Sequence, residues 1–115
     1  MRFIKKTSEY QDVYRRHYKV QGEYFTLLYK FCDNLSEPVV GIVIKSKVGK
    51  AVVRNKLKRR IRAYLNQHKD ILPPNLSAVI IARDNASDAG WQDINEDLSN
   101  CRREIDNQLR RFKQS

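Results

Sequence analysis

Apolar residues near the start of the chain recur at spacings of three and four, which is the period of a helix. The pattern predicts a short first helix over about Glu9–His17. Ser8, followed three residues later by Gln11, matches the capping box that often begins a helix. The positions expected to share one face of this helix are Tyr10, Val13, Tyr14 and His17.

The middle of the chain changes to strand patterns. Residues 23–31 alternate in polarity after the turn residue Gly22, and the predicted aromatic side of this strand is formed by Phe25, Leu27, Tyr29 and Phe31. Two β-branched runs, VVGIVIK at Val39–Lys45 and LSAVIIA at Leu76–Ala82, are short enough to be buried strands. Tyr18–Gln21 is too short for its pattern to decide whether it is a further strand.

Two longer segments return to helical spacing. The first is Val52–Gln67, which is followed by the helix-ending residues Pro73 and Pro74. The second begins near Trp91 and is preceded by the cap-type residues Ser87 and Asp88. The apolar stripes are Val53, Leu57, Ile61, Tyr64 and Leu65 in the first, and Trp91, Ile94, Leu98, Cys101, Ile105, Leu109 and Phe112 in the second.

Helices with one apolar stripe bury it by packing on a sheet, so the sequence predicts an α+β two-layer sandwich with the element order αβββαβα. A length of 115 residues favours a single domain over residues 1–115. The pattern does not determine the hand of the connection from Val39 to Ala82, for which the general preference is right-handed.

The distribution of charge along the chain says more about a binding partner than the overall composition does. The formal net charge is +10, and residues 38–69 contain ten Lys or Arg and no Asp or Glu. At about 100° per residue, the basic and apolar sides of the predicted helix Val52–Gln67 are opposite each other. Cations three and four residues apart repel one another, so the helix is expected to need a polyanionic partner, either nucleic acid or an anionic membrane surface. The membrane is disfavoured because the apolar stripe is needed for the core.

Other chemistry is sparse. Cys32 and Cys101 are isolated, which favours two structural thiols, and His17 and His68 lie far apart without a ligand-like neighbour. Three acidic residues of the last helix, Asp93, Glu96 and Asp97, are interpreted as a solvated face. A metal-dependent nuclease acting alone is therefore not expected, whereas an RNA-binding module such as a ribosomal protein remains an alternative. No apolar run of membrane-spanning or signal-peptide length occurs, and we expect the cytoplasm.

The segment GIVIKSKVGKAVVRNKLKRRIRAYL closely resembles the signature of the protein subunit of bacterial ribonuclease P. It combines a Gly-led apolar strand, a V-G-K-A-V turn and an Arg-Asn-x-x-Lys-Arg-x-x-Arg helix. The E-Y-x-x-V-Y, Y-F-T-L-L-Y and VIIAR segments extend the similarity over essentially the whole chain. The resemblance implies a left-handed βαβ crossover. It also implies an accessory subunit without an active site of its own, assisting an RNA that uses Mg²⁺ to remove the 5′ leader of precursor tRNA.

The resemblance also implies two sets of binding residues. Those expected to dock on the catalytic RNA are Arg54, Asn55, Lys56, Lys58, Arg59 and Arg62. Those expected to receive the single-stranded leader are Tyr10, Tyr14, Phe25, Lys45, Lys47, Lys50 and Arg83. The implied partners are ribonuclease P RNA and precursor tRNA, with no membrane and no obligate protein partner. Stacking of aromatic rings on unpaired bases tolerates any sequence, which suits leaders that vary.

Overall fold

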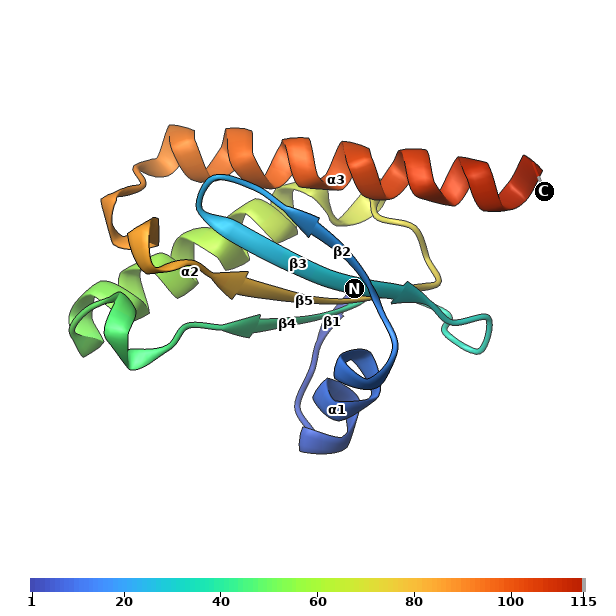
Figure 1. Cartoon of the computed structure of the whole chain (residues 1–115), viewed down its shortest axis with the longest axis horizontal. Coiled ribbons are helices and arrows are strands. Elements are labelled where there is room, and N and C mark those ends of the chain that lie inside the picture. Colours follow the sequence, from blue (N-terminus) through green and yellow to red (C-terminus); the bar gives the residue numbers. More distant parts are fainter. Residues whose placement is uncertain (115) are drawn as a thin grey trace.

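The elements follow the predicted order, with one addition at the start of the chain. The computed structural model describes the backbone of residues 1–114 and the side chains of residues 1–111, and within them five strands form one sheet on which three α-helices pack (Figure 1). The elements are β1 (Arg2–Phe3), α1 (Thr7–Arg15), β2 (Tyr18–Gln21), β3 (Phe25–Phe31), β4 (Val39–Val43), α2 (Ala51–His68), β5 (Leu76–Ala82) and α3 (Trp91–Gln114). Short 3₁₀ segments lie at Ser46–Val48, Lys69–Ile71 and Asp84–Asp88.

The sheet has the order β1-β4-β5-β3-β2. β4 is parallel to β1 and to β5, whereas β3 is antiparallel to β5 and β2. In Figure 1, β4 and β5 point left, β5 lies above β4, and the connecting helix α2 lies behind them, which makes this crossover left-handed. The α+β class is confirmed, and the hand of the crossover follows the family resemblance instead of the general preference.

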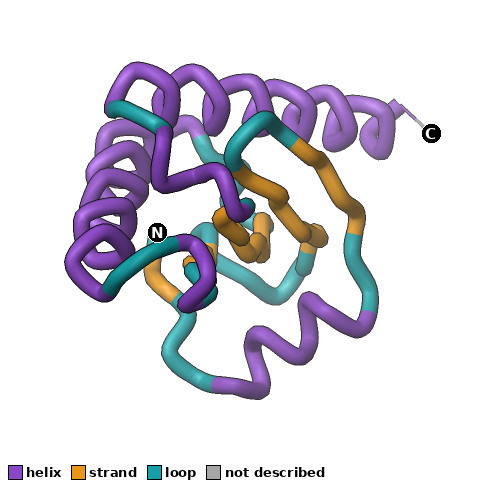
Figure 2. The backbone as a smooth tube through the Cα atoms, turned by 60° about the vertical axis from the view of Figure 1, so that its left-hand side comes forward, coloured by secondary structure: helices purple, strands orange, loops and turns teal. Residues whose placement is uncertain are grey.

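Strand alternation divides the apolar side chains between two cores. Figure 2 shows the backbone of the helices arranged around the strands. The larger core lies between the sheet and the helices α2 and α3, and the smaller one lies under α1 on the opposite face. The predicted aromatic side of β3 exists and faces the larger core. Buried members of the larger core include Phe25, Leu27, Tyr29, Leu57, Ile61, Leu98 and Ile105, and those of the smaller core are Ile4, Val13, Val39 and Val79.

The beginning of α1 corrects the capping-box prediction. Ser8 and Gln11 both lie inside the helix, and its N-cap is Lys6, which makes no side-chain cap hydrogen bond. The Ile4 N–H donates to the carbonyl of Val40 (3.0 Å), so pairing with β4 holds the chain up to two residues before this cap. A long-range contact therefore sets the entry to the helix, and the local pattern misplaced it. The strand β1 was missed because two residues carry no period.

Several details of the later helices also differ from prediction. Val53 is 37% exposed, although the rest of its predicted stripe on α2 is buried, and Trp91 is exposed to the same extent. Ser87 and Asp88 lie in a 3₁₀ segment and do not cap α3, where the Gly90 N–H instead donates to the carboxylate of Asp93 (3.0 Å). The predicted stripe residue Phe112 lies outside the described side chains.

The isolated cysteines and histidines have structural surroundings, as predicted. Cys101 is buried and Cys32 half-buried, and both are free thiols. Burial, with a smaller contribution from Asp97, raises the pKa of the Cys101 thiol to about 12, so this thiol stays protonated at neutral pH. The Nδ1 atoms of His17 and His68 lie 3.1 and 2.8 Å from carbonyl oxygens one turn earlier in the chain.

Asp97 does not belong to a solvated helix face, contrary to the sequence-based interpretation. Its side chain is buried, and its carboxylate accepts three backbone N–H groups of the β2–β3 turn, those of Glu23 (2.7 Å), Tyr24 (3.0 Å) and Phe25 (3.1 Å). A Cβ atom at Gly22 would lie 2.4 Å from Asp97 Oδ1, so only glycine fits there. The carboxylate thus satisfies turn donors that would otherwise be buried without acceptors.

We expect Asp97→Asn to lower the free energy of unfolding by roughly 2–4 kcal/mol, because an amide cannot accept all three turn N–H groups and its own N–H₂ opposes them. The matched control is Glu96→Gln on the exposed side of the same helix, expected to change stability by less than about 0.5 kcal/mol. Urea unfolding followed by circular dichroism measures both. Equal stability of the two variants would contradict the anchoring role of Asp97.

Candidate nucleic-acid interface

The basic face of α2 is exposed because the apolar stripe on the opposite side of the helix is buried in the core. Leu57, Ile61, Tyr64 and Leu65 are buried against the sheet and α3. The predicted polar positions on the outer side of the helix are all exposed: Asn55, Lys56, Lys58, Arg59 and Arg62. Arg54 is half-buried, and its buried Nε has no hydrogen-bond partner among the described residues.

Acidic groups do not neutralise this face. Among the side chains of residues 1–111, no ion pair involves a cation of α2, and the first turn of the helix contains no acidic residue. On α3, by contrast, Arg102 pairs with Asp106 at 3.4 Å. Uncompensated cations on one helix face repel one another, so binding of an external polyanion relieves a repulsion that the fold itself leaves in place.

The first turns of α2 border a depression beside β4. Arg54, Asn55 and Lys58 line it together with Ile42 and Ile44, and its volume is about 290 Å³. Guanidinium and ammonium groups donate to phosphate oxygens, and an amide can both donate to and accept from a ribose hydroxyl or a base edge. These donors converge on one concave surface, as a sugar–phosphate backbone requires.

The strand β1 joins this basic face to α1. The Arg62 guanidinium lies over the ring of Phe3, 5.3 Å from its centroid. Phe3 also lines a small cavity of about 60 Å³ with Tyr10, Lys58 and Arg62. The structure therefore brings an aromatic residue of α1 next to two cations of α2 around the edge of the sheet, a juxtaposition that the sequence pattern did not predict.

Tyr10 and Tyr14 form a pair of rings on α1. Their centroids are 6.4 Å apart with planes inclined by 32°, and Tyr14 is 43% exposed. Partial burial, with a smaller effect of Tyr10, raises the pKa of Tyr14, whose hydroxyl therefore remains neutral. Tyr10 is seated against Gly41 of β4, where a Cβ atom would lie 2.5 Å from its Cε1. The pair offers both a stacking surface and a neutral hydroxyl.

A second group of cations lies at the ends of β4 and β5. Lys45, Lys47 and Arg83 line a depression of about 460 Å³ together with Asn85. Lys47 forms an exposed ion pair with Asp84 at 3.5 Å. Arg83 also has a structural contact, because its Nη1 donates to the carbonyl of Gly22 (2.7 Å).

Lys50 lies apart from this depression. It is the exposed N-cap residue of α2, makes no side-chain cap hydrogen bond, and does not line the cavity formed by the other strand-end cations. Six of the seven predicted leader-binding residues thus have some exposed surface, distributed over α1, the strand ends and the start of α2.

The assignment of Phe25 to the leader-binding set is wrong. Its ring is 0% exposed and packs in the core beneath α2 and α3, on the face of the sheet opposite α1. Tyr10 and Tyr14 lie on the other side. Alternation explains the error, since the residues of β3 that point toward α1 are its even-numbered ones.

Two residues near α1 were missed. Lys30 on β3 pairs with Asp12 of α1, the Nζ–Oδ2 distance being 2.7 Å, and Leu28 packs with the smaller core. Applying the two-residue period of β3 to its even-numbered positions could have found both. Phe3 had no such signal, because its role depends on a strand pairing distant in sequence.

Among the described residues, no group of three or more His, Cys, Asp or Glu side chains could hold a metal ion. The described helices also include none that is long and apolar enough to cross a membrane.

A family model described as Ribonuclease P matches residues 1–106. The ribonuclease P protein component of Staphylococcus carnosus is 38% identical over 96 residues, covering 83% of this chain and 82% of that protein. Among solved structures, the ribonuclease P protein of Staphylococcus aureus superposes with a TM-score of 0.81 at 29% identity, covering 90% of this chain and 93% of that one. The ribonuclease P protein of Thermotoga maritima gives a TM-score of 0.75 at 29% identity, covering 83% and 89%.

We expect Gly41→Ala to destabilise the protein by about 1–3 kcal/mol, because the added methyl group overlaps the ring of Tyr10. The cost should be much smaller in a Tyr10→Ala background, where the overlapping ring is absent. A double-mutant cycle from denaturant unfolding measures the coupling between the two positions. Additive effects would mean that the ring is not seated on Gly41.

Proposed function

This chain belongs to the ribonuclease P protein family, and from this premise we propose that it binds the catalytic RNA and the 5′ leader of precursor tRNA through two adjoining surfaces. The observation that carries the proposal is the outer face of α2, where Asn55, Lys56, Lys58, Arg59 and Arg62 are exposed without an acidic partner among the described side chains. A folded RNA supplies the dense negative charge that such a face attracts.

The basic face of α2 is the surface proposed for the RNA subunit. Arg54 supports this assignment, because its side chain borders the depression shared with Asn55 and Lys58. A phosphate or ribose oxygen in that depression would accept from the guanidinium N–H groups that reach it. The planar fork of arginine suits two phosphate oxygens at once, whereas Lys56 and Lys58 contribute point charges.

The α1 side is the surface proposed for the leader. Tyr10 and Tyr14 provide rings for stacking, and Lys45, Lys47 and Arg83 provide cations at one end of the same face. Lys50 adds a further cation at the start of α2, apart from that group. Stacking contributes roughly 1–3 kcal/mol per base without selecting a sequence, which an unpaired segment of variable sequence needs. Because Tyr10 borders the same small cavity as Lys58 and Arg62, the leader and the RNA subunit are proposed to meet along the β1 edge.

Hydrolysis is assigned to the RNA subunit, with Mg²⁺ held mainly by that RNA. The protein contributes affinity and orientation: its cations neutralise phosphates of both RNAs, and its aromatic pair fixes the leader next to the cleavage site. No protein partner is part of this proposal. The alternative of a ribosomal RNA-binding protein predicts co-sedimentation with ribosomal subunits, whereas the proposed function predicts restored cleavage of precursor tRNA by a bacterial ribonuclease P RNA at low Mg²⁺.

We expect Arg59→Ala combined with Arg62→Ala to weaken binding to ribonuclease P RNA and to reduce the slope of log affinity against log salt by about one for each phosphate that is no longer neutralised. The charge-matched control is Arg103→Ala combined with Arg110→Ala, which removes two exposed cations of α3. Filter binding over a range of salt concentrations measures both. Identical slopes for the two double variants would contradict the assignment of the α2 face.

Tyr14→Ala is expected to lower affinity for leader-bearing precursor about tenfold while leaving affinity for mature tRNA unchanged, because only the precursor carries unpaired bases to stack. Tyr14→Phe retains the ring and should retain the discrimination. Circular dichroism melting establishes that both variants are folded. A precursor-to-mature ratio that Tyr14→Ala does not change would argue against the leader surface.

A further inference from the structure

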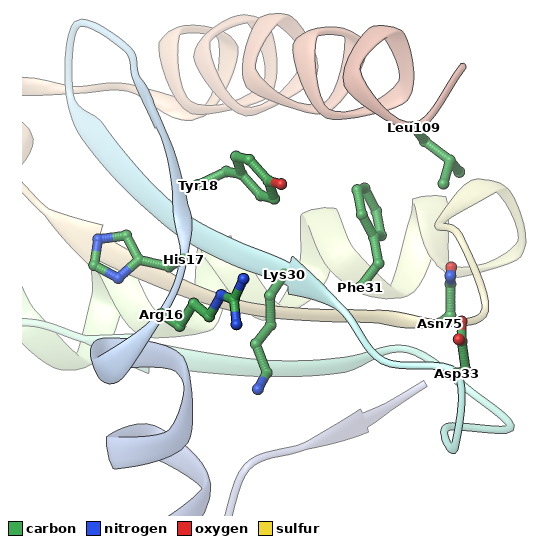
Figure 3. A pocket seen from close by; sticks show the side chains of 8 residues that line it. All are labelled: Arg16, His17, Tyr18, Lys30, Phe31, Asp33, Asn75 and Leu109. Atoms are coloured by element: carbon green, nitrogen blue, oxygen red, sulfur yellow. The ribbon is translucent and has the colours of Figure 1, made fainter. Parts of the chain in front are cut away.

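The two ends of β3 are organised differently. Near Phe31, a cavity of about 720 Å³ is lined by side chains from both faces of the strand, and Figure 3 shows Phe31 pointing toward α3 whereas Lys30 points away from it. Lys30 pairs with Asp12 of α1 at 2.7 Å. The residues at this end therefore do not form one binding surface. At the other end of β3, hydrogen bonds connect α3 through the β2–β3 turn to the segment that follows β5.

Two peptide groups of the β2–β3 turn are contacted on both sides. The first joins Gly22 to Glu23. Its N–H donates to Asp97 Oδ1 (2.7 Å), and its carbonyl accepts from Arg83 Nη1 (2.7 Å). The second joins Glu23 to the next residue, and its N–H donates to Asp97 Oδ2 (3.0 Å) while its carbonyl accepts from the side-chain amide of Asn85 (3.1 Å). Each peptide group thus lies between the carboxylate on one side and a side-chain donor on the other.

The geometry of the peptide group couples these two sides. Both peptide groups are planar and trans, so the N–H and the C=O of each point in opposite directions. An acceptor that fixes the N–H therefore also fixes the direction of the carbonyl. Because the acceptor is a carboxylate and one donor is a guanidinium, the two charges polarise the peptide group between them and strengthen both hydrogen bonds. The buried carboxylate of Asp97 thus determines where Arg83 and Asn85 find their acceptors.

Arg83 and Asn85 keep groups available for a ligand. Both are exposed, and both line the depression of about 460 Å³ that they share with Lys45 and Lys47. The two contacts of Arg83 with the turn carbonyls, at 2.7 and 3.4 Å, go through Nη1, which leaves the N–H groups of Nη2 and Nε for a phosphate. Asn85 uses Nδ2 for the turn, which leaves its amide oxygen to accept from a ribose hydroxyl.

We propose that Asp97 is a positioning residue for leader binding: through the two peptide groups of the turn, it holds Arg83 and Asn85 in the geometry that receives the leader backbone. The inference rests on the proposed function, because it requires that the strand-end cations bind the leader. It adds Asp97 and Asn85, neither of which the sequence pattern assigned to RNA binding. A guanidinium that is already held loses less side-chain entropy on meeting a phosphate, and this gain in affinity carries no sequence preference.

The test measures the ratio of the affinities of the reconstituted holoenzyme for leader-bearing precursor and for mature tRNA. Asp97→Asn is expected to lower this ratio about fivefold, because an amide cannot accept all of the turn N–H groups and Arg83 loses its fixed acceptors. The stability-matched control is Ile105→Ala, which removes buried apolar atoms from the same helix and should leave the ratio unchanged. Urea unfolding establishes that both variants are folded in the assay and are destabilised to a similar extent.

A second comparison separates positioning from a purely structural role. In a chain that carries Arg83→Ala and Asn85→Ala, the ratio is expected to fall about tenfold. Adding Asp97→Asn to that chain should lower the ratio no further, because the residues through which Asp97 acts are absent. A further fall in the triple variant, or equal ratios for Asp97→Asn and Ile105→Ala, would overturn the inference.

Arg83→Lys carries the test if Asp97→Asn does not fold. Arg83 is exposed, and lysine keeps its charge, but one ammonium cannot contact the turn and a phosphate through separate nitrogens. A loss of about threefold in the ratio supports positioning by the turn, whereas a ratio equal to that of the unaltered protein overturns it. Failure of the proposed function has a different signature, since the ratio would then be unchanged both in the chain with Arg83→Ala and Asn85→Ala and in Tyr14→Ala.

Discussion

The burial of one side of α2 is the constraint on which the proposed RNA-binding surface depends. Leu57, Ile61, Tyr64 and Leu65 fix the rotation of the helix about its own axis, and their burial offsets the mutual repulsion of the cations on the other side. A helix with this charge density and no acidic neighbour would be unfavourable in isolation. The apolar core therefore determines which side of α2 carries the exposed positive charge, and the left-handed crossover determines on which face of the sheet α2 lies.

The β2–β3 turn links helix α3 to one of the cations at the strand ends. Asp97 of α3 accepts its N–H groups from one side, and Arg83 donates to its carbonyls from the other. Arg83 also lines the depression with Lys45 and Lys47. Arg83, one of the residues proposed to contact RNA, is thus positioned by a turn that the buried carboxylate of Asp97 holds.

Local periodicity was sufficient to predict the main helices and strands, and the concentration of like charges was sufficient to predict the basic face of α2. Sequence reasoning failed where a residue's environment depends on distant segments. Phe25 was placed in the leader set by the family resemblance, although alternation along β3 turns it to the opposite core. Asp97 looked like an ordinary exposed acid because its partners lie more than 70 positions earlier in the chain. Phe3 reaches Arg62 only through the pairing of β1 with β4.

The position of β5 has a consequence for how the molecule assembles during synthesis. This strand is the last of the sheet to be translated, yet it occupies the centre and pairs with both β3 and β4. Until the ribosome has released residue 82, two earlier strands lack their shared neighbour and their apolar sides stay accessible. The basic helix, whose hydrogen bonds are local, precedes β5 in the chain. The nascent polypeptide therefore carries its cationic segment before its sheet is complete, and the native sheet can form only after β5 has been synthesised.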